Sequence, residues 1–352
     1  MKEISRRDFL KFLGIGALGL AAQPRLAFGE ELPGRDLASD VVQCIDDTAL
    51  SVTSIRPATV QVMMDESIKA LTGLSNVGAA WKAVFSGITA SSIIGIKVNC
   101  INNLFATHPS VVTCITNGLA QMDFGGTPFR RNNIIIWDRT NSELTAAGYT
   151  LYTGTDPNTV RCFGTDQSGY GYDTGTTFNV NGVTSYPSRI LSRTIDYLID
   201  AAVLRTHGTS IVTLGMKNHF GSVNNPGSLH GNYCNPYIPS LNQQIRDVIT
   251  PNGIQKLTVI DGIVGLYSGG PGGTPNCAPR ALIMGRDVVA CDYVGQTLIN
   301  YERSRRNLSP VSAPHIPTAA QPPYSLGTTD VNLIEVNNPT AGLVRQRRRA
   351  VR

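Results

Sequence analysis

The sequence reads SIIGIKVN at residues 92–99, and this run of Ile and Val is the first of five that decide the fold. The others are NIIIWDR (133–139), AAVLRTH (201–207), KLTVIDG (256–262) and RALIMGRD (280–287). Runs rich in Ile and Val that do not alternate strictly with polar residues are typical of strands buried on both faces. They predict a central, mostly parallel sheet that is covered by helices.

Segments with apolar residues at helical spacing separate or follow these runs. They are PSVVTCITNGLAQM (109–122), NSELTAAG (141–148), IPSLNQQIRDVI (238–249) and DVVACDYVGQTLINYER (287–303). The alternation of strand and helix predicts an α/β fold in which helices flank the sheet. Residues 152–187 are rich in Gly, Thr, Asp and Tyr and show little periodicity, so we expect a loop-rich β excursion there.

Composition and charge divide the chain into three parts. A content of 41% hydrophobic and 16% charged residues excludes a disordered chain. Residues 1–29 carry a net charge of +3, and the last eight residues, RQRRRAVR, carry +5. Because the whole chain has a net charge of +5, residues 30–344 carry −3. A basic excess outside the folded part argues against nucleic acid as a partner. We expect a signal peptide (1–29), an α/β domain (30–303) and an irregular tail (304–352) that ends in the Arg-rich stretch.

The N-terminal region has the pattern of an export signal. ISRRDFLK at 4–11 places Arg6 and Arg7 before the apolar stretch FLGIGALGLAA at 12–22, and small residues allow cleavage after Gly29. This pattern matches the twin-arginine signal, which predicts the twin-arginine translocase as a partner and a periplasmic location. No later stretch reaches the eighteen apolar residues of a membrane span, so we expect none in the mature protein.

The seven cysteines argue against a cluster or zinc site made of thiolates. No two of them form a C-x-x-C pair, and none lies in a ferredoxin-like run. We therefore expect no iron–sulfur cluster. Cys100 and Cys114 are either a disulfide or two buried thiols, and the spacing leaves both alternatives open.

Polar residues follow the predicted strands where the strands end, at Asn99, His108, Asp138, Arg139, His207 and Asp261. The carboxyl ends of parallel strands share one rim, which is where open α/β sheets bind ligands. Lys217, Asn218, His219 and His230 follow in the stretch after His207. We therefore expect one pocket at the rim that contains His207, Lys217 and His230.

Each of these side chains has an expected role. Imidazole ligates transition metals and carries protons near neutral pH, so we expect His207, His219 and His230 as ligands of a divalent transition metal. Lys217, His207 and Asp138 are the candidate catalytic groups, while Lys217, Asn218 and Arg139 are candidates for binding a cofactor. The Gly-rich stretch SGGPGGTP (268–275) lacks the Lys-Ser/Thr of a phosphate-binding P-loop and is expected to be a mobile surface loop.

Over roughly residues 92–300 the chain resembles the domain of unknown function 362 family. The resemblance rests on GIKVN (95–99), THP (107–109), IIIWDR (134–139), RTH (205–207), LGMKNHFG (214–221), His230, VIDGIVG (259–265), GGPGGTP (269–275) and RDVVACD (286–292). It implies an α/β domain without a settled activity. Many relatives carry ferredoxin-like cysteine motifs that this chain lacks. The order His207, Lys217, His230 is also similar to the His/Lys/His order of nickel-pincer lactate racemases, although the surrounding motifs differ.

Three function classes follow from these observations. The first is an exported metal- or cofactor-dependent enzyme with a His/Lys site at the sheet rim. The second is a non-catalytic periplasmic protein that binds a small anionic ligand through Lys217 and Arg139. The third is an accessory protein whose rim has no chemical role.

The export signal yields the first testable prediction. Replacing both Arg6 and Arg7 by Lys should leave the precursor in the cytoplasm, because the translocase reads the arginine pair. Fractionation followed by immunoblotting measures the distribution. Normal periplasmic accumulation of the double variant would contradict the export argument.

Overall fold

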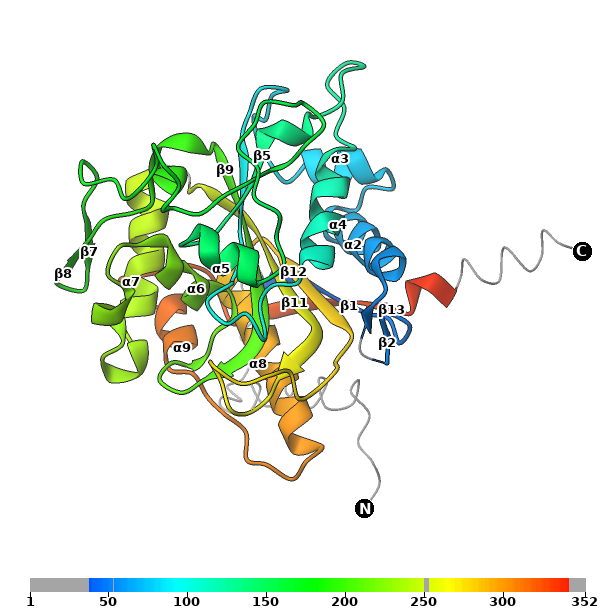
Figure 1. The fold of residues 1–352 in the computed structure, drawn as a ribbon. Coiled ribbons are helices and arrows are strands. Elements are labelled where there is room, and N and C mark those ends of the chain that lie inside the picture. The colour runs from blue at the N-terminus through cyan, green and yellow to red at the C-terminus, as the bar shows by residue number, and fades with distance from the viewer. Residues whose placement is uncertain (1–37, 53, 250–252, 342–352) are drawn as a thin grey trace, which may run out of the picture.

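The computed structural model describes residues 38–52, 54–249 and 253–341 (Figure 1). The expected signal peptide and the Arg-rich end lie outside the described residues. Within the described ranges the chain builds one large sheet with helices on both sides (Figure 1). No described helix has the length and apolar character needed to cross a membrane.

The central sheet contains all five predicted strands. In spatial order its strands are β13 (Val331–Asn337), β1 (Ser39–Ile45), β12 (Ala281–Gly285), β11 (Gln255–Leu266), β9 (Tyr197–His207), β4 (Ile94–Lys97), β5 (Ile134–Trp137) and β6 (Arg161–Cys162), with β10 (Ile211–Val212) paired to β9. Neighbours from β11 to β6 are parallel, and β1 is parallel to β13. The mostly parallel sheet is therefore confirmed, although β12 runs antiparallel to both β1 and β11.

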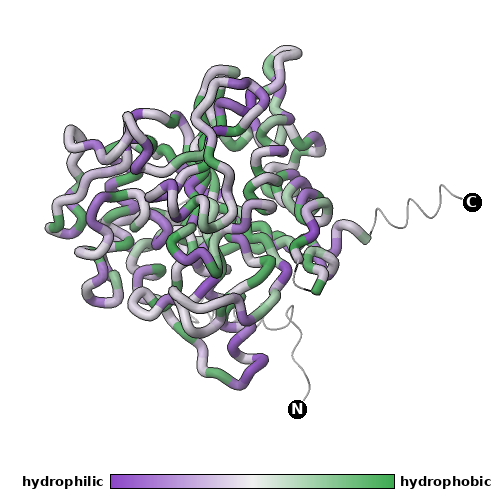
Figure 2. The backbone as a smooth tube through the Cα atoms, viewed as in Figure 1, coloured by the Kyte–Doolittle hydropathy of each residue, from purple (hydrophilic) through white to green (hydrophobic). Residues whose placement is uncertain are grey.

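Helices cover the two faces of this sheet. One face carries α2 (Pro57–Thr72), α3 (Val77–Lys82), α4 (Pro109–Leu119) and α5 (Asn141–Ala146), and the other carries α6 (Leu214–Asn218), α7 (Tyr237–Gln244), α8 (Val288–Ser304) and α9 (His315–Ala320). Successive strand residues contribute to opposite cores: Ile283 packs with α8, whereas Leu282 packs with α2. Figure 2 shows hydrophobic residues gathered along the central strands. This double coverage explains why the strands read as continuous apolar runs.

The expected irregular tail is partly regular. Residues 304–344 include α9 and β13, and β13 pairs in register with β1 from Ser39 to Ile45. Both ends of the described chain thus belong to the same sheet as the predicted domain. β13 is an edge strand that is only partly buried, so its sequence VNLIEVN lacks the long apolar run that identified the central strands.

The segment 152–187 forms the expected excursion. It contains a short hairpin of β7 (Phe178–Val180) and β8 (Val183–Ser185) among loops. Its β6 joins the edge of the central sheet by pairing with β5, so the excursion also extends that sheet. A second two-stranded hairpin, β2 (Leu50–Ser51) with β3 (Ser54–Ile55), precedes α2.

None of the seven cysteines, all of which lie in the described ranges, forms a disulfide. Of the two alternatives for Cys100 and Cys114, the structure therefore has two buried thiols rather than a disulfide. Burial raises the pKa of the Cys114 thiol to about 12, which keeps it protonated and unreactive near neutral pH.

Asp287 connects three parts of the chain and yields a stability prediction. Its carboxylate accepts hydrogen bonds from the N–H groups of Val289 and Ala290 at the start of α8, from Ser39 Oγ and from the Thr328 N–H. Asp287→Ala should lower the free energy of unfolding by about 2 kcal/mol, because it removes a helix cap and two further bonds. Urea unfolding measures the change. The exposed Asp47→Ala is the matched control, and equal effects of the two substitutions would contradict the prediction.

Candidate functional site

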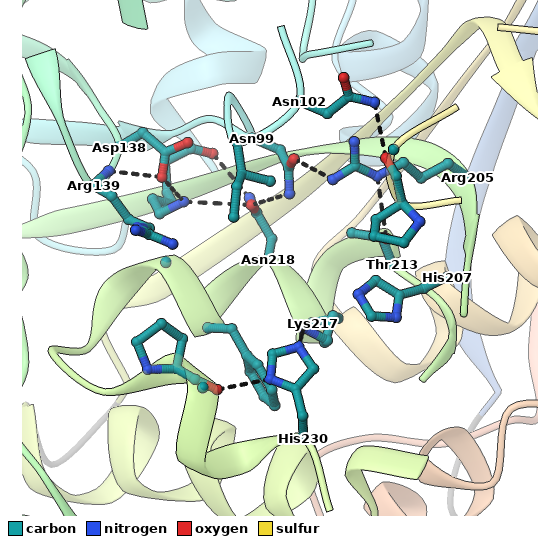
Figure 3. A pocket seen from close by; sticks show the side chains of 18 residues that line it. Asn99, Asn102, Asp138, Arg139, Arg205, His207, Thr213, Lys217, Asn218 and His230 are labelled. Atoms are coloured by element: carbon teal, nitrogen blue, oxygen red, sulfur yellow. Dashed lines mark hydrogen bonds and ion pairs between the residues drawn. The ribbon is translucent and has the colours of Figure 1, made fainter. Parts of the chain in front are cut away.

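The carboxyl ends of β4, β5 and β9 open onto a cavity of about 360 Å³ (Figure 3). Its polar lining includes Lys97, Asn99, Asn102, Asp138, Arg139, Arg205, His207, Thr213, Lys217, Asn218 and His230. These side chains come from the ends of β4 and β9, from the residues that follow β4 and β5, and from the segment after β9. The cavity therefore lies where ligands bind in open α/β sheets.

The structure brings most of the expected rim residues to this cavity but not all of them. Asn99, Asp138, Arg139, His207, Lys217, Asn218 and His230 line it. His108 lines a different hollow, where its Nδ1 accepts the Ser110 N–H. Asp261 is buried and accepts the N–H groups of His108 and Ile263. His219 is fully buried and lies outside the lining.

Lys217 is positioned by a tight chain reversal. The chain turns after β9, pairs back through β10 and enters α6, with Ile211 and Leu214 in the left-handed region at φ of 71° and 51°. Asp292 holds this turn by accepting the N–H groups of Gly215 and Met216. A side chain at Gly215 would place its Cβ 2.8 Å from Asp200 Oδ2, so only glycine fits there without a shift. The short helix then directs Lys217 into the cavity.

Asn218 connects α6 to the strand ends. Its Oδ1 accepts a hydrogen bond from Asn99 Nδ2 at 2.9 Å, and its Nδ2 donates to Asp200 Oδ1 at 2.6 Å. Beside it, Lys97 Nζ lies 2.6 Å from Asp138 Oδ1 in a fully buried ion pair. These polar atoms bond to one another within the protein, and so they hold the strand ends and α6 together.

Lys217 has an environment unlike that of an ordinary lysine. It is 7% exposed, and its Nζ lies 3.2 Å from His230 Nε2 and 3.7 Å from the centre of the Phe220 ring. No described carboxylate forms an ion pair with it. Burial lowers the pKa of Lys217 to about 7, so a large share of the amine is neutral at neutral pH.

Hydrogen bonds fix which ring nitrogen of each imidazole carries the proton. His230 Nδ1 lies 2.9 Å from the Pro226 carbonyl, so it donates and leaves the Nε2 lone pair facing Lys217. His207 Nδ1 accepts the N–H groups of Thr209 and Ser210, so the neutral ring carries its proton on Nε2. The two rings are stacked with centroids 5.8 Å apart. The cavity therefore has one imidazole acceptor and one imidazole donor.

The charges that line the cavity favour an anion. Arg205 is 1% exposed and bonds only neutral oxygens among the described residues, namely Asn99 Oδ1, the Phe105 carbonyl and Thr213 Oγ1. Arg139 contacts Glu143 at 3.7 Å, a long ion pair at the protein surface. Asp138 is the one carboxylate in the described lining, and it is paired with Lys97. A positive excess remains for a ligand.

The proposed metal ligands do not come together in this arrangement. His219 donates from Nε2 to Gln255 and contacts Ser222 through Nδ1, so both of its ring nitrogens have partners. A neutral His207 with its proton on Nε2 has no lone pair to offer the cavity. Within the described ranges no group of three His, Cys, Asp or Glu side chains is placed to hold a metal ion. The residues therefore do not fit a metal site shared by His207, His219 and His230.

Sequence reasoning missed two charged residues of the cavity. Lys97 and Arg205 lie within the apolar runs SIIGIKVN and AAVLRTH. A long charged side chain in a strand that is buried on both faces needs a partner or a ligand. A Lys or Arg inside an apolar run is therefore the sequence signal that could have identified these two residues. His315, in the expected irregular tail, was also missed. It is fully buried, and neither ring nitrogen has a hydrogen-bond partner among the described residues.

Comparisons with known proteins identify one matching family. The model of a family described as a domain of unknown function (DUF362) matches residues 94–297. No curated protein matches the chain. A crystal structure of a Thermotoga maritima protein from the Northeast Structural Genomics Consortium is similar at 10% identity and a TM-score of 0.37. That similarity covers 72% of this chain and 59% of the other, so less than two thirds of the Thermotoga protein is matched.

The buried amine predicts a pH-dependent stability. The unfolded chain keeps the proton of Lys217 up to about pH 10.5, whereas the folded protein releases it near 7. Between these values the unfolded state holds more protons, so stability rises with pH. Lys217→Met should therefore be more stable than the wild type near pH 7, and its advantage should shrink by roughly 1 kcal/mol per pH unit as the pH rises.

Urea unfolding at several pH values measures this difference. Lys82→Met, which removes a lysine whose Nζ donates to the Asp123 carbonyl, is the control variant. A difference between Lys217→Met and the wild type that stays constant with pH would contradict the neutral, buried amine.

Proposed function

This chain belongs to the DUF362 family, and we propose that it is an exported periplasmic enzyme that acts on a small anionic substrate through Lys217, His207 and His230. The observation that carries the proposal is the Lys217 amine, which is buried beside His230 without a described carboxylate partner. The export part of the proposal depends on the twin-arginine pattern at Arg6 and Arg7. In this account the translocase is the partner during export, and the periplasm is the site of action.

The guanidinium groups supply the binding energy for an anion. Arg205 is held rigidly by three neutral acceptors and keeps its full charge uncompensated by a direct carboxylate contact. Arg139 lies at the same cavity with a side chain that is 31% exposed. Guanidinium groups bind carboxylate and phosphate through charge-assisted hydrogen bonds, which are stronger than bonds between neutral groups.

The amine and the two imidazoles supply the chemistry. A neutral amine is a base and a nucleophile, and His230 Nε2 is placed 3.2 Å away to accept a proton from it. Burial lowers the pKa of His207 to about 3, so this ring stays neutral and acts as a hydrogen-bond donor from Nε2. Such a donor stabilises negative charge that develops on a substrate oxygen.

A non-catalytic binding protein is the second candidate. It is favoured by the positive excess of the cavity, which would hold an anion whether or not a reaction follows. The two candidates differ in the role of Lys217. In an enzyme the amine reacts, whereas in a binding protein it adds one more charge to the ligand site.

Titration calorimetry with pyruvate, lactate, malonate and phosphate tests the anion site. Arg139→Met should weaken binding by about tenfold or more, because one charge-assisted hydrogen bond is lost. Arg130→Met removes an exposed arginine outside the cavity lining and should leave the affinity unchanged. If none of these anions binds, or if both substitutions act alike, the anion site is contradicted.

The same panel separates an enzyme from a binding protein. Proton NMR spectra follow the bound anions over time with the wild type and with Lys217→Met. An enzyme predicts conversion that Lys217→Met abolishes while most of the affinity remains. A binding protein predicts no conversion and a loss of affinity in this variant.

A further inference from the structure

The cavity contains two buried lysines that differ in their partners. Lys97 Nζ contacts Asp138 Oδ1 at 2.6 Å and the Val98 carbonyl at 2.7 Å, and it lies 3.4 Å from Asn218 Oδ1. These contacts use all three N–H groups of an ammonium and neutralise its charge. Among the residues that the structure describes, Lys217 Nζ has one hydrogen-bond partner, the acceptor nitrogen of His230. Lys97 is therefore held as part of the protein framework, whereas Lys217 keeps capacity for another group.

The neighbours of Lys217 leave its lone pair available. In the neutral amine one N–H points to His230 Nε2, and the face of the Phe220 ring lies 3.7 Å away on another side. Phe220 and His230 themselves pack edge to face with centroids 5.2 Å apart, which holds both rings in place. An aromatic face does not donate a conventional hydrogen bond, so it does not occupy the lone pair. The nitrogen can thus attack an electrophile in the cavity.

We infer that Lys217 forms an imine with a small aldehyde or ketone that carries a carboxylate or a phosphate. This inference rests on the proposed function and names its substrate class. The carbonyl is required because it is the group that a neutral amine attacks reversibly. The anionic substituent is required because Arg139 and Arg205 line the same cavity of about 360 Å³.

The step balances without an oxidant or a reductant. Lys217 Nζ attacks the carbonyl carbon, a C–N bond forms, and the electron pair of the C=O π bond moves to the oxygen. His230 Nε2 accepts a proton from the nitrogen and passes it to the alkoxide, which becomes a hydroxyl. It then carries the second nitrogen proton to this hydroxyl while the nitrogen lone pair forms the second C–N bond. The C–O bond then breaks, water leaves, and a C=N bond joins Lys217 to the substrate. His207 Nε2–H stabilises the oxygen of the tetrahedral intermediate by a hydrogen bond.

Reductive trapping tests the inference. The protein is incubated at about pH 8 with pyruvate or with dihydroxyacetone phosphate in the presence of sodium cyanoborohydride, which reduces an imine to a stable amine. At this pH a lysine with a pKa of about 7 has roughly two hundredfold more neutral amine than an ordinary lysine. Intact mass should show one adduct per chain, and peptide mapping should place it on Lys217, with Lys69, Lys82 and Lys97 largely unmodified.

The two probes identify the anionic group. A faster adduct with pyruvate assigns a carboxylate substrate, and a faster adduct with the phosphate ester assigns a phosphorylated one. Arg139→Met should slow trapping of the preferred probe by about tenfold and leave trapping of uncharged acetone unchanged. Lys217→Arg removes the amine and should give no adduct at this position.

The outcomes separate this inference from the proposed function. If calorimetry shows that pyruvate or the phosphate ester binds in the cavity but no adduct forms at Lys217, the imine is wrong and the anion site remains. If neither probe binds but lactate, malonate or phosphate does, the imine is wrong and the anion site remains. If none of these anions binds, both proposals are wrong. Equal modification of Lys217 and the surface lysines would also overturn the imine, because it would show no special reactivity of the buried amine.

Discussion

The buried ion pair between Lys97 and Asp138 holds together the ends of two parallel strands. Lys97 is the last residue of β4 and Asp138 directly follows β5, and the pair is 1% and 3% exposed. Removing one partner of such a pair typically costs about 3–5 kcal/mol, because the other charge remains buried and alone. Asn218 joins this pair to Asn99 and Asp200, and so fixes α6 against the strand ends. The position of Lys217, one residue earlier in α6, depends on this network.

The contrast between Lys97 and Lys217 gives the cavity its chemistry. One lysine has a carboxylate partner and serves as a structural cation, whereas the other is buried beside an imidazole and an aromatic ring. Burying an amine without a carboxylate partner costs stability, and such costs are commonly found at functional sites. The positive excess from Arg139 and Arg205 adds to this cost until an anion binds. These properties together favour a reactive site over a purely structural one.

The sequence predicted the strands whose two faces are both buried. Five strands that are covered on both faces gave apolar runs, and their parallel order put Asn99, Asp138 and His207 at one rim, as the structure has them. The edge strand β13 was missed because a half-exposed strand gives a weaker pattern. His219 and His230 could not be told apart, since both follow the same strand. The different positions of the two histidines depend on side-chain packing. The position of the proton on His207 depends on the loop N–H groups of Thr209 and Ser210, which donate to its Nδ1.

The proposed chemistry requires that the Lys217 amine be largely neutral near pH 7, and NMR measures its protonation state directly. Carbon-13 labelling of lysine side chains, with Lys217→Arg to assign the resonance, allows the Lys217 Cε shift to be followed as the pH changes. We expect a single titration of this resonance with a pKa of about 7. A pKa near the ordinary lysine value of about 10.4 would show a charged amine at neutral pH and would contradict the proposed chemistry.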